Sequence, residues 1–344
     1  MEAIIGLGES GCNVAVQYFN KTRRKYKLIL LNTAKDDLNK ITEPSAIKLV
    51  VGKGEGSGRN PKKTVEIFSE VRDKVQDFLK QVLLDDTEVD EVNIFAGLGG
   101  GTGSGSLPFI IDILLQMNIT VKTTMILPLS LEGNPSCSNA LALLQKINTD
   151  YIENGLITAV IVNNDDYQKH LGKGGGFTWY DVNSKIVDAC IKMFDFDSFR
   201  GNPKLNGLKS LDKEEFKRIV YPDKQYHGFL NIFELSLKNG PDSLSIDFDL
   251  SKGKKAIVLF KTKKPITISV LEKLNMWVPY FKIVAESDCE DGQDACYILI
   301  NGLPLPDTLL GQRLKEVQDQ IKGLKKENKS KKVSNINSDE LLDI

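Results

Sequence analysis

The stretch that decides the fold of this chain runs from Asn93 to Gly105 and reads NIFAGLGGGTGSG. It begins as an apolar strand, and six glycines follow within residues 97–105. Glycine permits backbone conformations with φ > 0 and lets other atoms approach closely, at the cost of stability in packed structure. A helix-like apolar run from Leu107 to Met117 comes next, so the glycines lead into a helix N-terminus, which attracts anions. The pattern predicts a phosphate-binding loop, and the alternative is a flexible surface loop.

Length and composition narrow the class of protein. The chain has 344 residues, enough for two domains, with 41% hydrophobic residues, 26% charged residues and a formal net charge of −1. This charge excludes a global basic field that would draw the molecule to nucleic acid or membrane. The 5 cysteines are odd in number, which indicates reduced thiols and a cytoplasmic protein. No apolar run has the ~18–20 residues that span a bilayer, so no membrane partner is expected.

On both sides of the glycine-rich stretch, strand patterns alternate with helix patterns. Strands are predicted over residues 2–7, 28–31, 47–51, 92–96, 121–127 and 157–162. Helices are predicted from about Val14, over 62–83 after the capping pair Asn60-Pro61, from Leu107, and over 138–152. The alternation predicts an α/β fold with a Rossmann-like parallel sheet and helices on both faces. The polar clusters follow the strands, at the edge where such sheets bind ligands.

The second half of the chain has a different organisation. Residues 1–178 are predicted to form the first domain, and residues 179–197 a central helix whose two apolar sides indicate burial between two domains. Residues 198–305 are predicted to contain a polar connection and a smaller α+β domain. Its elements are strands over 229–237, 244–250, 256–261, 281–285 and 295–300, with a helix over 268–277. A heptad stripe predicts a C-terminal helix over 306–327, docked on its own domain or a neighbour, and residues 328–344 form a tail predicted to be disordered.

Two glycine patterns bear on the kind of nucleotide. Gly6, Gly8 and Gly11 follow the first strand with the spacing of a dinucleotide fingerprint. An NAD site also needs Asp or Glu after the second strand, where this chain has Asn32 and Thr33. Neither glycine loop has the lysine of a P-loop, so phosphates would be held by backbone N–H groups, hydroxyl groups and Mg²⁺. Two loops facing one crevice favour a compact polyphosphate, and an NAD-dependent oxidoreductase is the alternative from another class.

The segment Gly99–Gly105 resembles the signature loop of the tubulin/FtsZ superfamily. Companion motifs stand in the family's order: the turn that ends at Asn13, the pair Asn32-Thr33 and the glycine-rich loop 52–58. The resemblance covers about residues 1–220 and implies a cytoplasmic GTPase that binds GTP or GDP with Mg²⁺, without protein ligands to the metal. The GTP-binding residues that it implies are Gly8, Ser10, Gly11, Cys12, Asn13, Asn32, Thr33, Gly99, Gly100, Gly101, Thr102, Gly103, Ser104, Glu132, Asn164, Trp179 and Asn183.

Four of these residues receive individual roles from the resemblance. Glu132 is expected to accept hydrogen bonds from the sugar hydroxyls. Asn164 and Asn183 are expected to read the guanine edge, because an amide both donates and accepts hydrogen bonds. Trp179, one helical turn before Asn183, is expected to lay its aromatic face against the base, and the alternative is a core or interface residue.

Asp212 and Glu215 are the predicted catalytic residues. They resemble the family's synergy loop, which acts on the nucleotide of the next subunit, so the resemblance implies hydrolysis that waits for head-to-tail self-assembly. A heterologous interface of this kind propagates into a filament unless it closes into a ring. The alternative role of the pair is a helix capping box, and the two roles are compatible.

The C-terminal region resembles the TubZ branch of the superfamily, which segregates plasmid and phage DNA. Division proteins carry a basic residue where this chain has Asn134-Pro135-Ser136, and here a long helix and a lysine-rich tail replace their short tail peptide. The resemblance implies a centromere-binding adaptor, which is TubR-like, bound through the C-terminal helix and tail, and therefore indirect contact with DNA. A division filament and direct DNA binding by the lysine tail are the alternatives.

Overall fold

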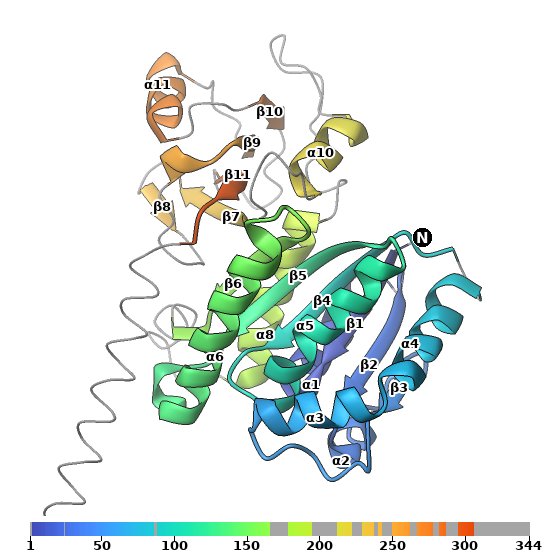
Figure 1. Cartoon of the computed structure of the whole chain (residues 1–344). Helices are drawn as coiled ribbons and strands as arrows, with labels where there is room; N and C mark the ends of the chain where they lie inside the picture. Colours follow the sequence, from blue (N-terminus) through green and yellow to red (C-terminus); the bar gives the residue numbers. More distant parts are fainter. Residues whose placement is uncertain are drawn as a thin grey trace, which may run out of the picture.

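The computed structural model describes residues 2–23, 25–85, 88–165, 178–194, 212–221, 229–236, 240–242, 250–261, 267–277, 282–286 and 295–305 (Figure 1). Several predictions lie outside these residues: the connection after the central helix, nearly all of the strand expected over 244–250, the C-terminal helix over 306–327 and the tail over 328–344.

A parallel sheet forms the centre of the first half of the chain. Its strands are β1 (Glu2–Leu7), β2 (Lys27–Asn32), β3 (Ile47–Val50), β4 (Glu91–Gly97), β5 (Thr120–Leu127) and β6 (Thr158–Asn163). They lie in the order β3-β2-β1-β4-β5-β6, and every neighbouring pair is parallel. The chain moves outward from β1 through β2 and β3 and then returns to the other side of β1 with β4. This reversal opens a crevice at the carboxyl ends of β1 and β4, and the predicted α/β class is confirmed.

Helices cover both faces of this sheet (Figure 1). One buried cluster packs the sheet against α1 (Gly8–Lys21) and α8 (Trp179–Phe194), together with Leu38 of the short helix α2 (Lys35–Asn39). The cluster on the other face packs it against α3 (Pro61–Glu70), α4 (Arg72–Lys80), α5 (Gly101–Gln116) and α6 (Asn134–Ile147). The strands are mostly apolar on both faces because both faces are covered. Within the part of the chain that the structure describes, no helix is long and apolar enough to cross a membrane.

The predicted starts of two helices were wrong. Helix α1 begins at Gly8 rather than near Val14, and α5 begins at Gly101 rather than at Leu107. Because glycine has a low helix propensity, the sequence pattern placed both helix starts too far toward the C-terminus. The tertiary contacts explain why glycine stands there: a Cβ on Gly11 would lie 2.2 Å from the carbonyl oxygen of Phe95. The glycines let these first turns pack directly on the sheet.

Two further helices differ from their predicted bounds. The helix expected over 62–83 breaks at Val71, whose φ is −119°, into α3 and α4, and a π-helical turn, Gln81–Asp85, follows α4. Helix α6 begins at Asn134 rather than Ser138, because Pro135 fits the first turn of a helix, where its missing N–H costs no hydrogen bond. It ends at Ile147, and a π-helical turn, Asn148–Ile152, continues the chain.

Among the residues that the structure describes after α8, strands of both directions and two α-helices are present. The elements are α10 (Lys213–Val220), β7 (Phe229–Ser236), β8 (Gly240–Asp242), β9 (Lys255–Lys261), α11 (Ile268–Trp277), β10 (Lys282–Glu286) and β11 (Ala295–Leu303), with short 3₁₀ turns over Ser130–Glu132 and Leu250–Lys252. Strand β11 is antiparallel to both β7 and β9, and β10 is parallel to β9. Among the described residues, the pair of Ala159 with Phe229 links β7 to β6 in parallel. Helix α11 has its predicted bounds, whereas β8 was not predicted.

Helix α8 packs against strands of both halves. Its buried side chains include Ile186 and Cys190, and they share one apolar cluster with Val160 of β6 and with Ile257 of β9 and Leu299 of β11. The two apolar sides of this helix in the sequence are therefore both covered, as a central helix requires.

Candidate active site

The two glycine-rich turns meet at the carboxyl ends of β1 and β4. Gly8 opens α1 with φ of +69°, and a Cβ on it would lie 3.0 Å from the backbone nitrogen of Gly103. A Cβ on Gly103 would lie 2.4 Å from the carbonyl oxygen of Gly97. The first turns of α1 and α5 therefore pack against each other at one crevice, and the prediction that the loops face each other is confirmed.

The crevice is open beside Gly100. This residue is the N-cap of α5, and a Cβ on it would meet no heavy atom within 4 Å. Neither N-cap residue, Leu7 for α1 or Gly100 for α5, supplies a side-chain cap. The first N–H groups of both helices thus lack intrahelical partners, as in every α-helix, and are available to an anion. This is the geometry that a phosphate group needs.

A third glycine-rich loop closes one side of the crevice. Gly52, Gly54, Gly56 and Gly58 all have positive φ, and Arg59 follows with φ of +60°. The loop packs on the start of α5, since a Cβ on Gly101 would lie 2.2 Å from Oγ of Ser57.

A side chain of α6 fastens this loop. The amide of Asn139 donates hydrogen bonds to the carbonyl oxygens of Arg59, at 3.0 Å, and Gly99, at 3.3 Å. Sequence reasoning found the third loop but missed Asn139, because nothing in the helical pattern around it distinguishes it from a surface polar residue.

A buried hydroxyl–amide network joins the end of β2 to the first turn of α5. Thr102 Oγ1 lies 2.7 Å from Thr33 Oγ1 and donates to Asn32 Oδ1 at 3.2 Å. All three side chains are buried. The hydroxyl of Ser104 donates to the carbonyl oxygen of Leu98. The network fixes the position of the loop, and the predicted contacts of these side chains with phosphate stay predictions.

The remaining predicted residues of α1 divide into exposed and buried positions. Ser10 and Asn13 are exposed, and the Cβ of Ser10 would lie 2.8 Å from a Cβ on Gly97. The thiol of Cys12 is buried and donates weakly to the carbonyl oxygens of Gly6 and Leu31. Burial raises the pKa of this thiol, so it stays protonated. Ser10 therefore borders the crevice, whereas Cys12 contributes a packed side chain beneath it.

The carboxyl ends of β5 and β6 supply the other wall. Asp165 accepts hydrogen bonds from the backbone nitrogen of Ser130, at 2.9 Å, and from its hydroxyl, at 2.6 Å, which ties the two strand ends together. Glu132 accepts from the backbone nitrogen of Leu129 at 3.0 Å. Asn164 is only 6% exposed, and its Oδ1 has no hydrogen-bond partner among the described residues. A buried acceptor without a partner fits a ligand that donates a hydrogen bond, as a guanine base does.

Trp179 and Asn183 lie in the first two turns of α8. Trp179 is 54% exposed, although large aromatic side chains are usually buried, and Asn183 is half-buried. An exposed indole suits either stacking on a base or contact with another protein. The structure agrees with both alternatives, and the predicted stacking stays a prediction.

Asp212 and Glu215 form a capping box at the start of α10. Asp212 Oδ1 accepts from the backbone nitrogen of Glu215 at 2.8 Å, and Glu215 Oε2 accepts from the backbone nitrogen of Asp212 at 3.3 Å. The structural role predicted for the pair is thus confirmed. Their predicted catalytic role stays a prediction.

The two predicted parts of the active site lie at opposite ends of the sheet. Lys213, the residue after Asp212, lines a cavity together with Glu2 and Glu91, which begin β1 and β4. The glycine crevice lies at the carboxyl ends of the same two strands. A strand of six or seven residues spans roughly 20 Å. In Figure 1, α10 lies toward the end of the sheet marked N, whereas α2 and α3 lie at the other end. The carboxylates of one chain therefore do not reach its own crevice.

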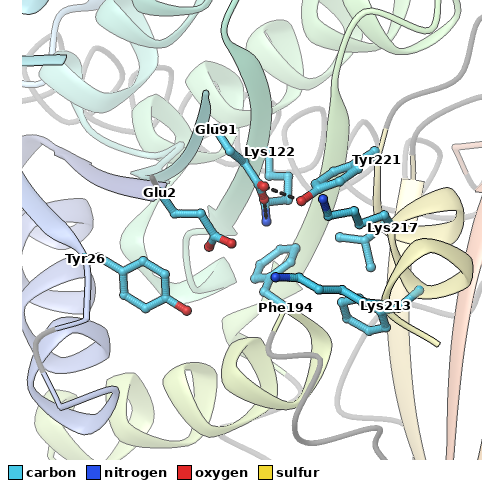
Figure 2. Close-up of a pocket in the computed structure, with 10 residues that line it drawn as sticks. Glu2, Tyr26, Glu91, Lys122, Phe194, Lys213, Lys217 and Tyr221 are labelled. Atoms are coloured by element: carbon cyan, nitrogen blue, oxygen red, sulfur yellow. Dashed lines mark hydrogen bonds and ion pairs between the residues drawn. The ribbon is translucent and has the colours of Figure 1, made fainter. Parts of the chain in front are cut away.

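The cavity beside α10 has a volume of about 320 Å³ and contains a buried charge cluster (Figure 2). Glu91 and Lys122 form an ion pair with side chains 7% and 3% exposed, and the hydroxyl of Tyr221 donates to Glu91. The ammonium of Lys122 also lies 4.9 Å from the ring centroid of Phe194 and 5.5 Å from that of Tyr221. Sequence reasoning missed the cluster, although the two charged residues inside apolar strands were a visible signal.

The electrostatics of this cavity follow from burial. Burial raises the pKa of Glu2, and the positive charge of Lys122 opposes that shift. Burial and the neighbouring carboxylate of Glu91 raise the pKa of Tyr221, so its hydroxyl keeps the proton that it donates.

Comparison with known proteins identifies the chain. Residues 3–167 match the model of the Tubulin/FtsZ family, GTPase domain, which includes both glycine turns and the third loop. This part of the chain belongs to the tubulin/FtsZ family. It is a GTPase domain, which binds guanine nucleotide, and this finding decides against the alternative of an NAD-dependent oxidoreductase.

The relatives differ in how much of the chain they match. Tubulin-like protein TubZ of Bacillus cereus is 24% identical over 369 residues, covering 94% of this chain and 82% of that protein. Cell division protein FtsZ 1 of Thermococcus kodakarensis is 30% identical over 168 residues, covering 47% of this chain but only 41% of that protein. In a GTPγS-form protofilament, TubZ of Bacillus thuringiensis serovar israelensis has the same fold, with a TM-score of 0.76 and 17% identity over 95% of this chain and 94% of that one.

Proposed function

We propose that this GTPase assembles head-to-tail and hydrolyses GTP at the junction between subunits. The observation that supports the proposal is the separation of Asp212 from the glycine crevice by the length of the sheet. If the amino edge of one subunit stacks on the carboxyl edge of the next, the first turn of α10 comes to the neighbour's nucleotide. The same contact then repeats along the chain of subunits and makes a filament.

The crevice would hold GTP mainly through backbone groups. The first turns of α1 and α5 present N–H groups and helix dipoles to the phosphates, and Gly100 leaves the space for them. Asn164, Asn183 and Trp179 would contact the base, and Glu132 the sugar. Among the described residues, no group of three or more His, Cys, Asp or Glu side chains could hold a metal ion. Mg²⁺ would therefore bind mostly to phosphate oxygens and water, where it offsets phosphate charge during hydrolysis.

The carboxylates would act on the attacking water. A carboxylate within hydrogen-bond distance of water can orient it and accept its proton. Asp212 is exposed, and its helical cap engages Oδ1. The cap also fixes the direction of the side chain, so the structural and the catalytic roles support each other.

A single substitution tests hydrolysis between subunits. Asp212→Asn keeps an oxygen for the helix cap but removes the negative charge. The variant should bind GTP as the wild type does, form filaments that pellet with GTP, and release phosphate far more slowly. Nucleotide binding is measured by calorimetry on the monomer, and phosphate release on pelleted filaments. Loss of GTP binding by the monomeric variant would contradict the action of Asp212 on the neighbouring subunit.

We further propose that the filaments segregate plasmid or phage DNA. Similarity to TubZ of Bacillus cereus extends over nearly the whole chain, whereas similarity to cell division protein FtsZ 1 of Thermococcus kodakarensis covers about half of it. A DNA-bound adaptor would attach through the C-terminal helix and basic tail, residues 306–344. A division filament is the alternative function, and its tail would bind a membrane-anchored partner instead.

Truncation separates these possibilities. A chain that ends at residue 321 should hydrolyse GTP normally and fail to recruit the adaptor–DNA complex in a co-pelleting assay. Unchanged recruitment would contradict the assignment to the tail. Binding of naked DNA by the full chain, with affinity that falls steeply with salt, would favour direct DNA contact.

A further inference from the structure

The charge cluster beside α10 is outside the nucleotide crevice, and the proposed chemistry does not use it. Glu91 begins β4, Lys122 lies near the start of β5, and Tyr221 is the C-cap of α10. The three side chains meet in the cavity wall, as Figure 2 shows. Buried ion pairs are weak stabilisers because the cost of desolvation offsets their attraction. A buried pair of this kind can instead specify a geometry, because each charge is satisfied only when its partner is in place.

The cluster contacts two residues, Phe194 and Tyr221, that flank the predicted catalytic segment in the sequence. Phe194, the last residue of α8, packs its ring against the ammonium of Lys122. Tyr221, directly after α10, packs its ring there too and donates its hydroxyl to Glu91. Asp212 and Glu215 lie between these two points in the sequence. One ion pair on the sheet thus fixes the chain before and after both carboxylates.

Other contacts fix the same end of α10. The amide of Asn301 in β11 donates to the carbonyl oxygen of Ile219 at 2.6 Å, and the ammonium of Lys255 in β9 donates to that of Arg218 at 2.8 Å. Phe216 and Val220 are buried. The first turn of α10, in contrast, carries exposed residues at 212, 213 and 214. The helix is therefore held at its C-terminal end and projects its carboxylates from the surface.

We infer that Glu91, Lys122 and Tyr221 are positioning residues for hydrolysis, which orient α10 so that Asp212 and Glu215 meet the nucleotide of the neighbouring subunit. The inference rests on the proposed function. A short helix that is held at one end moves its other end through a large arc when the hold loosens. Misplacement of a catalytic group by about 1 Å can lower a rate by about a hundredfold.

Tyr221→Phe removes the hydroxyl that joins α10 to Glu91 and keeps the ring beside Lys122. The matched control is Tyr26→Phe, which removes a hydroxyl from the same cavity wall at a residue that packs on Tyr18 of α1. A second variant, Glu91→Leu with Lys122→Met, replaces both members of the ion pair by apolar side chains and so leaves neither charge of the pair buried without the other.

The measurements are GTP affinity of the monomer, the amount of protein pelleted with GTP, and the kcat and KM of phosphate release by filaments. We expect Tyr221→Phe and the double variant to lower kcat by about tenfold to a hundredfold with unchanged GTP affinity and KM. Tyr26→Phe should keep the wild-type kcat. If the three residues only stabilised the fold, their substitution would alter thermal unfolding or assembly, and kcat would not fall at unchanged KM.

Wild-type kcat in both variants, measured on filaments, would overturn the inference while the proposed function stands. An equal loss in Tyr26→Phe would also overturn it, because the effect would then belong to the cavity in general. If the wild-type protein itself neither pellets with GTP nor releases phosphate, the proposed function fails instead, and the two failures are thus distinguishable.

Discussion

The two ends of the parallel sheet are built on different principles. At the carboxyl end, glycines replace side chains, the N-termini of α1 and α5 lack side-chain caps, and Asn164 carries a buried acceptor without a partner among the described residues. At the amino end, Glu91 and Lys122 are buried with their charges paired inside the chain. The carboxyl end leaves its polar groups available to contact a ligand that binds and dissociates. The amino end uses its polar groups to hold a fixed geometry. Substitutions at the two ends should therefore have different effects on stability and on GTP binding.

The largest effect is expected at the amino end, from Lys122→Met. The substitution leaves the carboxylate of Glu91 buried without its counter-charge, which costs about 3–5 kcal/mol of unfolding free energy. Adding Glu91→Leu should recover most of that loss, because the unpaired carboxylate of Glu91 is then removed as well. Urea unfolding of the two single variants and the double variant measures this coupling. Equal destabilisation in the single and double variants would mean that packing, rather than charge, dominates the site.

Two glycines at the carboxyl end should separate folding from binding. Gly103→Ala places a Cβ against the carbonyl oxygen of Gly97 and should cost about 1–3 kcal/mol of stability through overpacking. Gly100→Ala meets no protein atom within 4 Å, so stability should be unchanged while GTP binding weakens. Thermal unfolding and calorimetric titration with GTP measure the two properties. If Gly100→Ala bound GTP normally, the space beside it would not be the phosphate position.

A smaller effect is expected from Asn164→Ala. Because Oδ1 of Asn164 has no partner among the described residues, its removal should leave the unfolding free energy of the free protein nearly unchanged. GTP affinity should fall by about tenfold, equivalent to ~1.4 kcal/mol for one lost hydrogen bond in a buried site. Titration with GTP and with ATP tests this directly. A variant that bound both nucleotides as the wild type does would remove Asn164 from the base site.

The smallest effect is a pH dependence at the amino end. Burial raises the pKa of Glu2 in the folded protein above its ordinary value of 4.5, so the folded state binds this proton more tightly than the unfolded state. Its contribution to stability is therefore fully present below pH 4.5 and is lost as pH rises through the folded pKa. Relative to the wild type, Glu2→Gln should gain stability over that rise. Parallel stability curves from pH 4 to pH 8 would contradict the raised pKa.

Local patterns predicted most of the fold and the meeting of the two glycine-rich turns at one crevice. Strands β1 to β6 and the bounds of α11 follow from apolar runs, because the periodic burial of side chains in a strand or helix shows in the hydrophobicity of neighbouring residues. The capping box at Asp212 was equally readable from spacing alone. The true starts of α1 and α5 were not, because their glycines are tolerated in helices only by contacts with Phe95 and Gly97.

The sequence by itself determined the class of this protein: the glycine stretch from Asn93 to Gly105, placed between a strand and a helix, specifies a phosphate crevice whatever surrounds it. Only the tertiary structure decided that Asp212 lies at the other end of the sheet and that Glu91, Lys122 and Tyr221 meet beside it. The physical reason is the sequence distance between the interacting residues. Backbone conformation and capping depend on residues a few positions apart, whereas a buried ion pair depends on strands and helices that only the folded sheet brings together.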